Sequence, residues 1–137
     1  MKYMVLMLLI SFVFLGISCQ KKEVPAMDIT GKEWRLAKWS DTALDPVDFT
    51  ITAIFTKDNI SGQSAVNQYN GPYTIKNNEF SVGTLVMTRM AGSPDQMKAE
   101  QTYHYLLGKA RKYSIDVSGL SLQNENNVEL LFFIQNK

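Results

Sequence analysis

Apolar and polar residues alternate along most of the chain beyond residue 30, which is the period of a β-strand with one buried face. The clearest stretch is residues 49–55, where threonines separate residues that would face a core. The pattern predicts strands at residues 33–39, 49–55, 60–66, 72–76, 79–87, 112–117, 120–123 and 128–134. Turn-forming residues connect them at 57–59, 70–71, 77–78, 118–119 and 124–127. Because these connections are short, most neighbouring strands should be antiparallel.

One segment has the period of a helix instead. Ser93 is a typical N-cap, Pro94 suits the first helical position, and Gln96 completes a capping box. Gly108 and the basic residues after it are typical of a helix end. The apolar residues of this segment fall on one stripe, made of Ala99, Tyr103, Leu106, Leu107 and Ala110. We therefore predict an α+β fold, in which a strongly curved, mainly antiparallel sheet of about seven or eight strands packs against one helix.

The start of the chain has a different pattern. Residues 4–18 form an apolar run behind Lys2, shorter than the ~20 residues of a spanning helix, which indicates a signal peptide. Residues 15–19, Leu-Gly-Ile-Ser-Cys, fit a permissive lipobox, in which the only cysteine, Cys19, takes a lipid anchor with acyl chains such as palmitate. The alternative is an ordinary secretory signal with an incidental cysteine.

The expected organisation is a lipoprotein signal peptide at residues 1–18, a lipidated tether at 19–29 and one domain at 30–137. The polar residues 20–23 and Pro25 suit a tether. Gln20 after the cysteine favours the outer membrane of the cell envelope under the enterobacterial sorting rule. The domain would lie on the periplasmic or the surface face of that membrane.

Composition excludes several kinds of partner. Of the 14 basic residues, Lys2 would leave with the signal peptide, and the remaining 13 would balance 13 acidic ones. Such a chain has neither the basic surface of a nucleic-acid-binding protein nor a polybasic membrane patch. Acylation of Cys19 would leave no thiol for a disulfide, a metal or redox chemistry. We expect a monomer held together by packing and hydrogen bonds, without a cofactor.

Two motifs and the residues that follow them resemble the META domain, also called HslJ-like. The family pattern contains Ser-Gly, an Asn-aromatic-Gly-aromatic stretch, Thr-Arg-Met and a helix that starts near a glutamate. The chain matches it at Ser61, Gly62, Asn67, Tyr69, Gly71, Tyr73, Thr88, Arg89, Met90, Glu100, Tyr103 and Leu107. The resemblance covers about residues 30–135 and implies a META-like fold with stress-related, envelope or secretion-associated roles.

The departures from the family pattern also carry information. Val66 and Gly92 stand where the family usually has two cysteines. Their joint replacement implies that those cysteines pair in relatives, so we predict that Val66 and Gly92 are neighbours. A redox role carried over from relatives would have no thiol here.

The motif residues form a candidate binding or structural network of Asn67, Tyr69, Tyr73, Arg89 and Glu100. Apolar neighbours suggest a partly buried Arg89, whose guanidinium would need acceptors such as Glu100 and Asn67. This network would either pin the helix to the strands or place Arg89 to bind an anion or a partner's carboxylate. Tyr69 and Tyr73 would either pack beside a turn or form a binding shelf.

Catalysis is not expected. His104 is the only histidine, lies off the apolar stripe and would make a solvated contact with Glu100 at i, i+4. No serine lies in a nucleophile elbow, and no cluster has the spacing of a metal site. The sequence thus offers no catalytic residue.

Three functions remain open. The first is a non-enzymatic, membrane-anchored binding or assembly module of the envelope, in analogy with a type III secretion pilot lipoprotein of similar fold, which binds a partner segment in an apolar groove. The second is a small-ligand or lipid binder with a cavity inside the curved sheet, lined by residues 49–55 and 130–134. The third is a structural or protease-inhibitory surface protein.

Overall fold

The computed structural model describes residues 28–137. The predicted signal peptide, the lipid attachment at Cys19 and most of the tether lie outside the described residues. No helix within residues 28–137 is long and apolar enough to cross a membrane.

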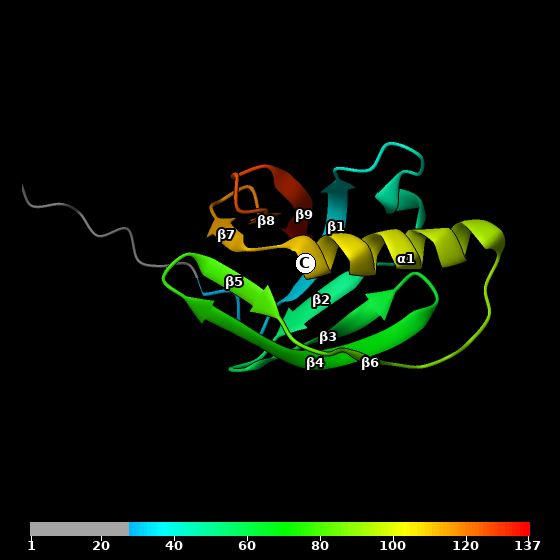
Figure 1. Cartoon of the computed structure of the whole chain (residues 1–137), viewed down its shortest axis with the longest axis horizontal. Coiled ribbons are helices and arrows are strands. Elements are labelled where there is room, and N and C mark those ends of the chain that lie inside the picture. Colours follow the sequence, from blue (N-terminus) through cyan, green and yellow to red (C-terminus); the bar gives the residue numbers. More distant parts are fainter. Residues whose placement is uncertain (1–27) are drawn as a thin grey trace, which may run out of the picture.

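An antiparallel sheet closes on itself into a barrel (Figure 1). Its strands are β1 (Glu33–Trp39), β2 (Thr52–Phe55), β3 (Asn59–Ser64), β4 (Asn67–Lys76), β5 (Glu79–Val82), β6 (Val86–Met87), β7 (Lys112–Ile115), β8 (Leu120–Gln123) and β9 (Glu129–Gln135). Eight of them follow the order β3-β2-β1-β9-β8-β7-β5-β4, and pairing of β3 with β4 closes the ring. The ninth, β6, pairs with β4. The predicted curved sheet with one packed helix is confirmed.

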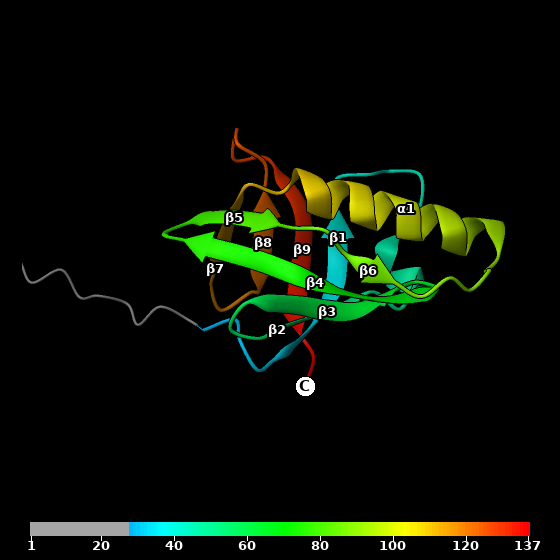
Figure 2. The same ribbon diagram turned by 60° about the horizontal axis from the view of Figure 1, so that its bottom comes forward.

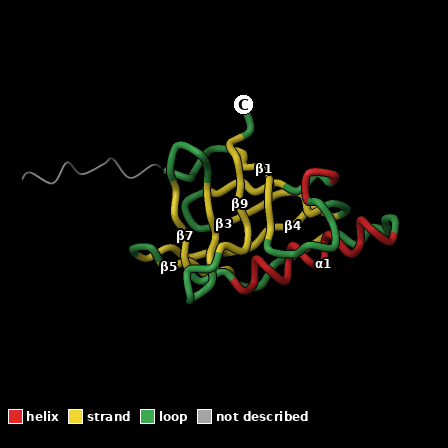
Figure 3. Tube along the Cα trace, turned by 90° about the horizontal axis from the view of Figure 1, so that it is seen from above, coloured by secondary structure: helices red, strands yellow, loops and turns green. Residues whose placement is uncertain are grey.

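Helix α1 (Pro94–Lys109) runs along one side of the barrel (Figures 2 and 3). It packs against β3, β5 and β9. The predicted start is confirmed, since the Gln96 amide donates to Ser93 Oγ and the Ser93 amide donates to Gln96 Oε1. At the other end, the Arg111 guanidinium donates to the carbonyl of Gly108 at 2.8 Å. A short 3-10 helix, η1 (Pro46–Asp48), precedes β2.

The barrel interior is filled by side chains. Residues 49–55 and 130–134 were expected to line a ligand cavity. Five of them have no solvent-exposed surface: Ile51, Ala53, Phe55, Leu131 and Phe133. Trp34 and Leu36 of β1 and Tyr103 and Leu107 of α1 complete this core. The predicted cavity between residues 49–55 and 130–134 is therefore wrong, because close packing of these side chains occupies the space.

The predicted turn at residues 70–71 is also wrong. Asn70 and Gly71 lie inside β4, and the chain reverses earlier, at Ala65 and Val66, where Ala65 has a φ of 70°. Close packing, and not a turn, requires glycine at position 71, because a Cβ there would lie 2.6 Å from the carbonyl oxygen of Thr84. Long-range packing outweighs the local turn preference of Asn-Gly.

Two further predictions concern the segment after β4. The single strand expected at residues 79–87 is divided into β5 and β6, and the register against β4 shifts between Val82 and Met87. Val66 and Gly92 are neighbours, as predicted, because a Cβ built on Gly92 would lie 2.5 Å from Val66 Cγ2. The two motifs are thus brought together in space.

Gly62 and Gly108 should respond oppositely to alanine. A Cβ at Gly62 would collide with the backbone carbonyl of Thr52, whereas Gly108 faces open space in α1. We expect Gly62→Ala to lower the free energy of unfolding by about 2 kcal/mol or more. Gly108→Ala should raise it by about 0.5–1 kcal/mol, because alanine is the better helix former. Urea unfolding measures both, and an equal response at the two positions would contradict the assigned packing.

Candidate functional site

A buried carboxylate connects α1 to the hairpin of β3 and β4. Glu100 is only 7% exposed. It accepts hydrogen bonds from the Asn67 amide at 2.8 Å, from Asn67 Nδ2 at 2.9 Å and from Ser64 Oγ at 3.0 Å. Since each donor belongs to the hairpin, one side chain of α1 fixes where the helix lies on the barrel.

Asn67 extends this network to the segment after β6. Its Oδ1 accepts from the Met90 amide at 2.7 Å and from Thr88 Oγ1 at 2.9 Å, and its Nδ2 also donates to the Met90 carbonyl at 3.2 Å. The Thr88 amide donates in addition to the carbonyl of Gln68. The residues on both sides of Arg89 are therefore held in place.

Arg89 itself lies outside the network, contrary to the sequence-based prediction. Its side chain is exposed, and it has no hydrogen-bond partner among residues 28–137. The physical reason is that the hairpin already supplies the donors that Glu100 needs. The side-chain oxygen of Asn67 already accepts hydrogen bonds from Thr88 and Met90. Of the predicted trio, the pairing of Asn67 with Glu100 is confirmed and the burial of Arg89 is wrong.

The two tyrosines of the motif pack in the core and form no binding shelf. Tyr69 is 3% exposed, and its hydroxyl lies 2.8 Å from the carbonyl oxygen of Thr52 and 2.6 Å from the hydroxyl of Tyr103. Tyr73 donates to the carbonyl of Thr56 at 2.6 Å. Burial raises the pKa of Tyr69 and of Tyr103, so both stay neutral and hydrogen-bonded.

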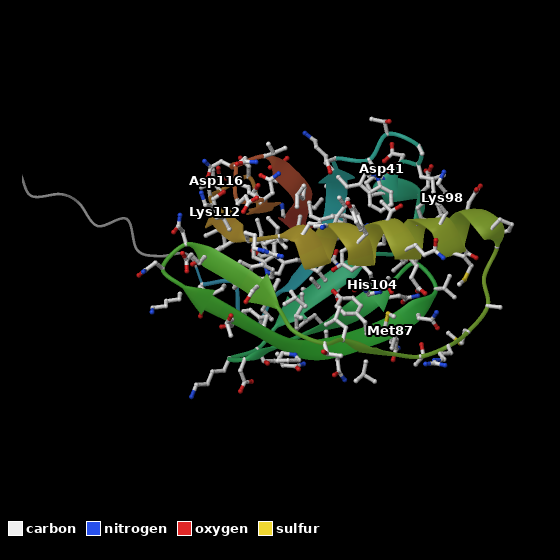
Figure 4. The ribbon with its side chains drawn as sticks, in the orientation of Figure 1. Asp41, Met87, Lys98, His104, Lys112 and Asp116 are labelled. Carbon is white, nitrogen blue, oxygen red and sulfur yellow. The ribbon has the colours of Figure 1, made fainter. Side chains whose placement is uncertain are left out.

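His104 belongs to the network, which the sequence did not reveal. It lies on the side of α1 that faces the strands (Figure 4), with Nε2 3.0 Å from Ser64 Oγ. Ser64 Oγ already donates toward Glu100 or the Asn67 carbonyl, so Nε2 of His104 is the donor in this pair. Nδ1 is buried and has no hydrogen-bond partner among residues 28–137. The predicted solvated contact with Glu100 is therefore replaced by a partly buried one with Ser64.

The trio of Ser64, His104 and Glu100 differs from an activated nucleophile. Ser64 is 0% exposed, so no substrate reaches its hydroxyl. Glu100 accepts from Ser64, while an orienting carboxylate would accept from Nδ1 of His104. Within residues 28–137 no group of three His, Cys, Asp or Glu side chains is arranged to hold a metal ion. What this arrangement does is position backbone segments.

The charges of the network are set by its hydrogen bonds. Burial alone would raise the pKa of Glu100, but donation from Asn67 and Ser64, together with the neighbouring His104, holds that pKa below its usual value. Burial lowers the pKa of His104, and the charge of Glu100 offsets only part of this effect. At neutral pH the folded state therefore holds an ionised Glu100 beside a neutral His104, and His104 is charged in the more acidic range where Glu100 titrates.

A trough of about 500 Å³ lies close to this network, on the outer face of the barrel. Four strands contribute to it, and its lining residues are Thr52, Ile54, Ser61, Gly62, Gln63, Gln68, Tyr69, Asn70, Val86, Met87 and Thr88. Met87, labelled in Figure 4, belongs to β6, one of these four strands. The sequence did not indicate this surface, because it arises from four segments that only the barrel brings together.

Comparison with known proteins gives one family and two solved structures. The family model described as META domain matches residues 27–137. An NMR structure of a protein from Burkholderia xenovorans is similar with a TM-score of 0.66 and 24% identity, over 80% of this chain and 84% of that one. A second NMR structure has a TM-score of 0.58 and 18% identity, over 76% and 89% of the two chains. Identities this low support the fold alone. No match was found among curated proteins.

The neutral His104 should make stability depend on pH. The pKa of His104 in the folded state is lowered from its ordinary value of 6.5. Its contribution to the free energy of unfolding is therefore complete above about pH 6.5 and is lost as the pH falls toward the folded-state pKa. We expect the free energy of unfolding to fall between about pH 7.5 and pH 5 in the wild type. His104→Gln keeps a donor near Ser64 but does not titrate, so it should show a smaller decrease.

Urea unfolding at the two pH values makes this comparison. Glu100, whose pKa is lowered, loses its contribution only at more acidic pH and does not obscure the result. Identical pH dependences of the wild type and His104→Gln would show that the half-buried ring of His104 does not titrate as described.

Proposed function

The chain belongs to the META domain family, and from this premise we propose that it is a non-enzymatic binding module anchored to the bacterial cell envelope. The anchor would be lipidated Cys19, which follows a signal peptide at residues 1–18. Gln20 supports the outer membrane as the location. The tether at residues 19–29 would let the domain reach a partner near the membrane.

The observation that carries this proposal is that Arg89 is exposed on a segment whose position is fixed. Thr88 and Met90 are both fixed to the side chain of Asn67, and Arg89 between them is exposed. Most other residues of the two motifs are occupied inside the fold. A charged side chain on a fixed segment loses less conformational entropy on binding than one on a loose loop.

The neighbours of Arg89 favour a protein partner. Its guanidinium is a planar fork that matches a carboxylate in two parallel hydrogen bonds. Met87 is 43% exposed and Met90 57% exposed, so apolar side chains flank the charge. Methionine adapts its shape to the surface it meets. An acidic residue within an apolar stretch of a partner has the matching chemistry.

The alternative functions have less support. A lipid or small ligand inside the barrel would have to displace packed core residues such as Phe55 and Phe133. An enzymatic role would need an accessible nucleophile or base, and Ser64 is 0% exposed. We therefore retain one function, a binding module that uses the outer surface around Arg89.

The anchor is tested by Cys19→Ser. The wild type should incorporate labelled palmitate and sediment with membranes, because acyl chains anchor the mature chain. Cys19→Ser should do neither, whereas Ser18→Ala, which keeps a small residue before the cysteine, should behave as the wild type. Equal labelling of the wild type and Cys19→Ser would refute the anchor.

The binding role is tested by substitutions of Arg89. Affinity capture from gently solubilised envelopes should recover a specific protein with the wild type, and Arg89→Ala should lose it. Arg89→Lys should recover less than the wild type, because lysine lacks the planar fork. Lys98→Ala removes another exposed positive charge and serves as the matched control.

All four proteins should have the same melting temperature, because the side chains of Arg89 and Lys98 are exposed and make no hydrogen bond within residues 28–137. Capture that is unchanged by Arg89→Ala would contradict the proposed site. A lower melting temperature of that variant would instead give Arg89 a structural role.

A further inference from the structure

Two rows of side chains cross the trough from β2 to β6. In the first row, Ile54 pairs with Ser61, Ser61 with Asn70, and Asn70 with Val86. The second row contains Thr52, Gln63, Gln68 and Thr88, joined by the pairing of Gln63 with Gln68 and by hydrogen bonds at each end. Four strands ~4.8 Å apart make each row ~14 Å long, which is the length of about four extended residues.

The middle of the trough is polar and uncharged. Ser61, Gln63, Gln68 and Asn70 contribute side chains that make no hydrogen bond to another described residue. Each side-chain amide offers a donor and an acceptor, which are the same two groups as in a peptide bond. No Asp, Glu, Lys or Arg lines the trough. A molecule bound there is therefore neutral over this stretch and rich in both donors and acceptors.

The ends of the first row are apolar. Ile54 lies at the β2 end, and Val86, 69% exposed, lies at the β6 end beside Met87. The one aromatic residue of the lining, Tyr69, is only 3% exposed, so the trough presents no ring face for a sugar or a base to stack on. Apolar side chains of a polypeptide fit these ends better than a pyranose ring does.

Charged residues adjoin both ends of the rows. Arg89 lies at the β6 end, and at the β2 end the exposed side chains of Arg35 and Glu33 in β1 stand opposite Thr52 and Ile54. Two arginines at opposite ends do not form the continuous basic surface that a nucleic acid or a phospholipid membrane needs. At the β6 end, Arg89 suits a single carboxylate. Charge complementarity therefore favours a chain that is neutral over about four residues and acidic next to them.

We propose that this trough binds an extended peptide segment of a partner protein, with uncharged residues across β2, β3, β4 and β6 and an acidic side chain at Arg89. The inference rests on the proposed binding function and specifies its ligand. The amides of Gln63, Gln68 and Asn70 hydrogen-bond the backbone of the segment, and Ile54 and Val86 contact its apolar side chains.

Selection from a display library of random peptides on the full chain in detergent tests the proposal. Enriched peptides should share an acidic residue next to an uncharged stretch. Asn70→Lys and Gln68→Lys place a charge in the trough at exposed positions, and each should weaken a selected peptide by about tenfold or more. Asn126→Lys, an exposed site on a distant turn, is the matched control and should change nothing.

A second set of measurements identifies the contact of the acidic residue. Replacing that residue by its amide in the peptide should weaken binding to the wild type, but not binding to Arg89→Ala. Backbone NMR shifts caused by the peptide should concentrate in β3, β4 and β6. A neutral oligosaccharide, used as a second probe, should cause no such shifts.

The outcomes separate this inference from the proposed function. Absence of enriched peptides, binding unaffected by Asn70→Lys, or shifts caused by the oligosaccharide would each overturn the peptide assignment. If envelope capture is lost in Arg89→Ala but retained in Asn70→Lys, the trough is wrong and the binding function stands. If neither variant affects capture, both are wrong.

Discussion

The rest of the structure depends on one buried carboxylate. Glu100 carries a charge inside the protein, and such a charge is tolerated only when hydrogen bonds replace its lost water. Ser64 and Asn67 supply these bonds, and they do so only when the hairpin, the helix and the segment around Met90 occupy their observed positions. A hydrogen bond to a charged group typically contributes about 1.5–3 kcal/mol, so this network strongly constrains how the parts join.

The constraint has a functional consequence. The side chain of Asn67 hydrogen-bonds to Glu100 of α1 through its Nδ2. Through its Oδ1 it accepts hydrogen bonds from Thr88 and Met90 of the exposed segment. A buried interaction thereby holds a surface segment rigid without a disulfide, although Val66 and Gly92, where relatives usually have cysteines, are in contact at this place. Arg89 is presented by this arrangement next to a neutral trough, and the proposed recognition of a peptide follows from that geometry.

The structural features that could be predicted from the sequence are those that local interactions determine. The sequence predicted a helix capped by Ser93 and ending near Gly108, because a capping box and an apolar stripe are encoded within a few turns, and the structure places it at Pro94–Lys109. The strands were predicted because apolar and polar residues alternate along each one. Closure of the barrel could not be predicted, since it depends on distant pairings. The sequence predicted a partly buried Arg89 because its neighbours are apolar, yet Met87 and Met90 are themselves exposed. The trough combines four segments and has no local signal.

Hydrogen exchange of single backbone amides tests most directly whether the buried network fixes the exposed segment. The Met90 amide donates to Asn67 Oδ1, and the Asn67 amide donates to Glu100. Both should exchange as slowly as the core strands, although Met90 belongs to an exposed segment. Exchange of Met90 as fast as that of Val117, a 96% exposed loop residue, would contradict the account.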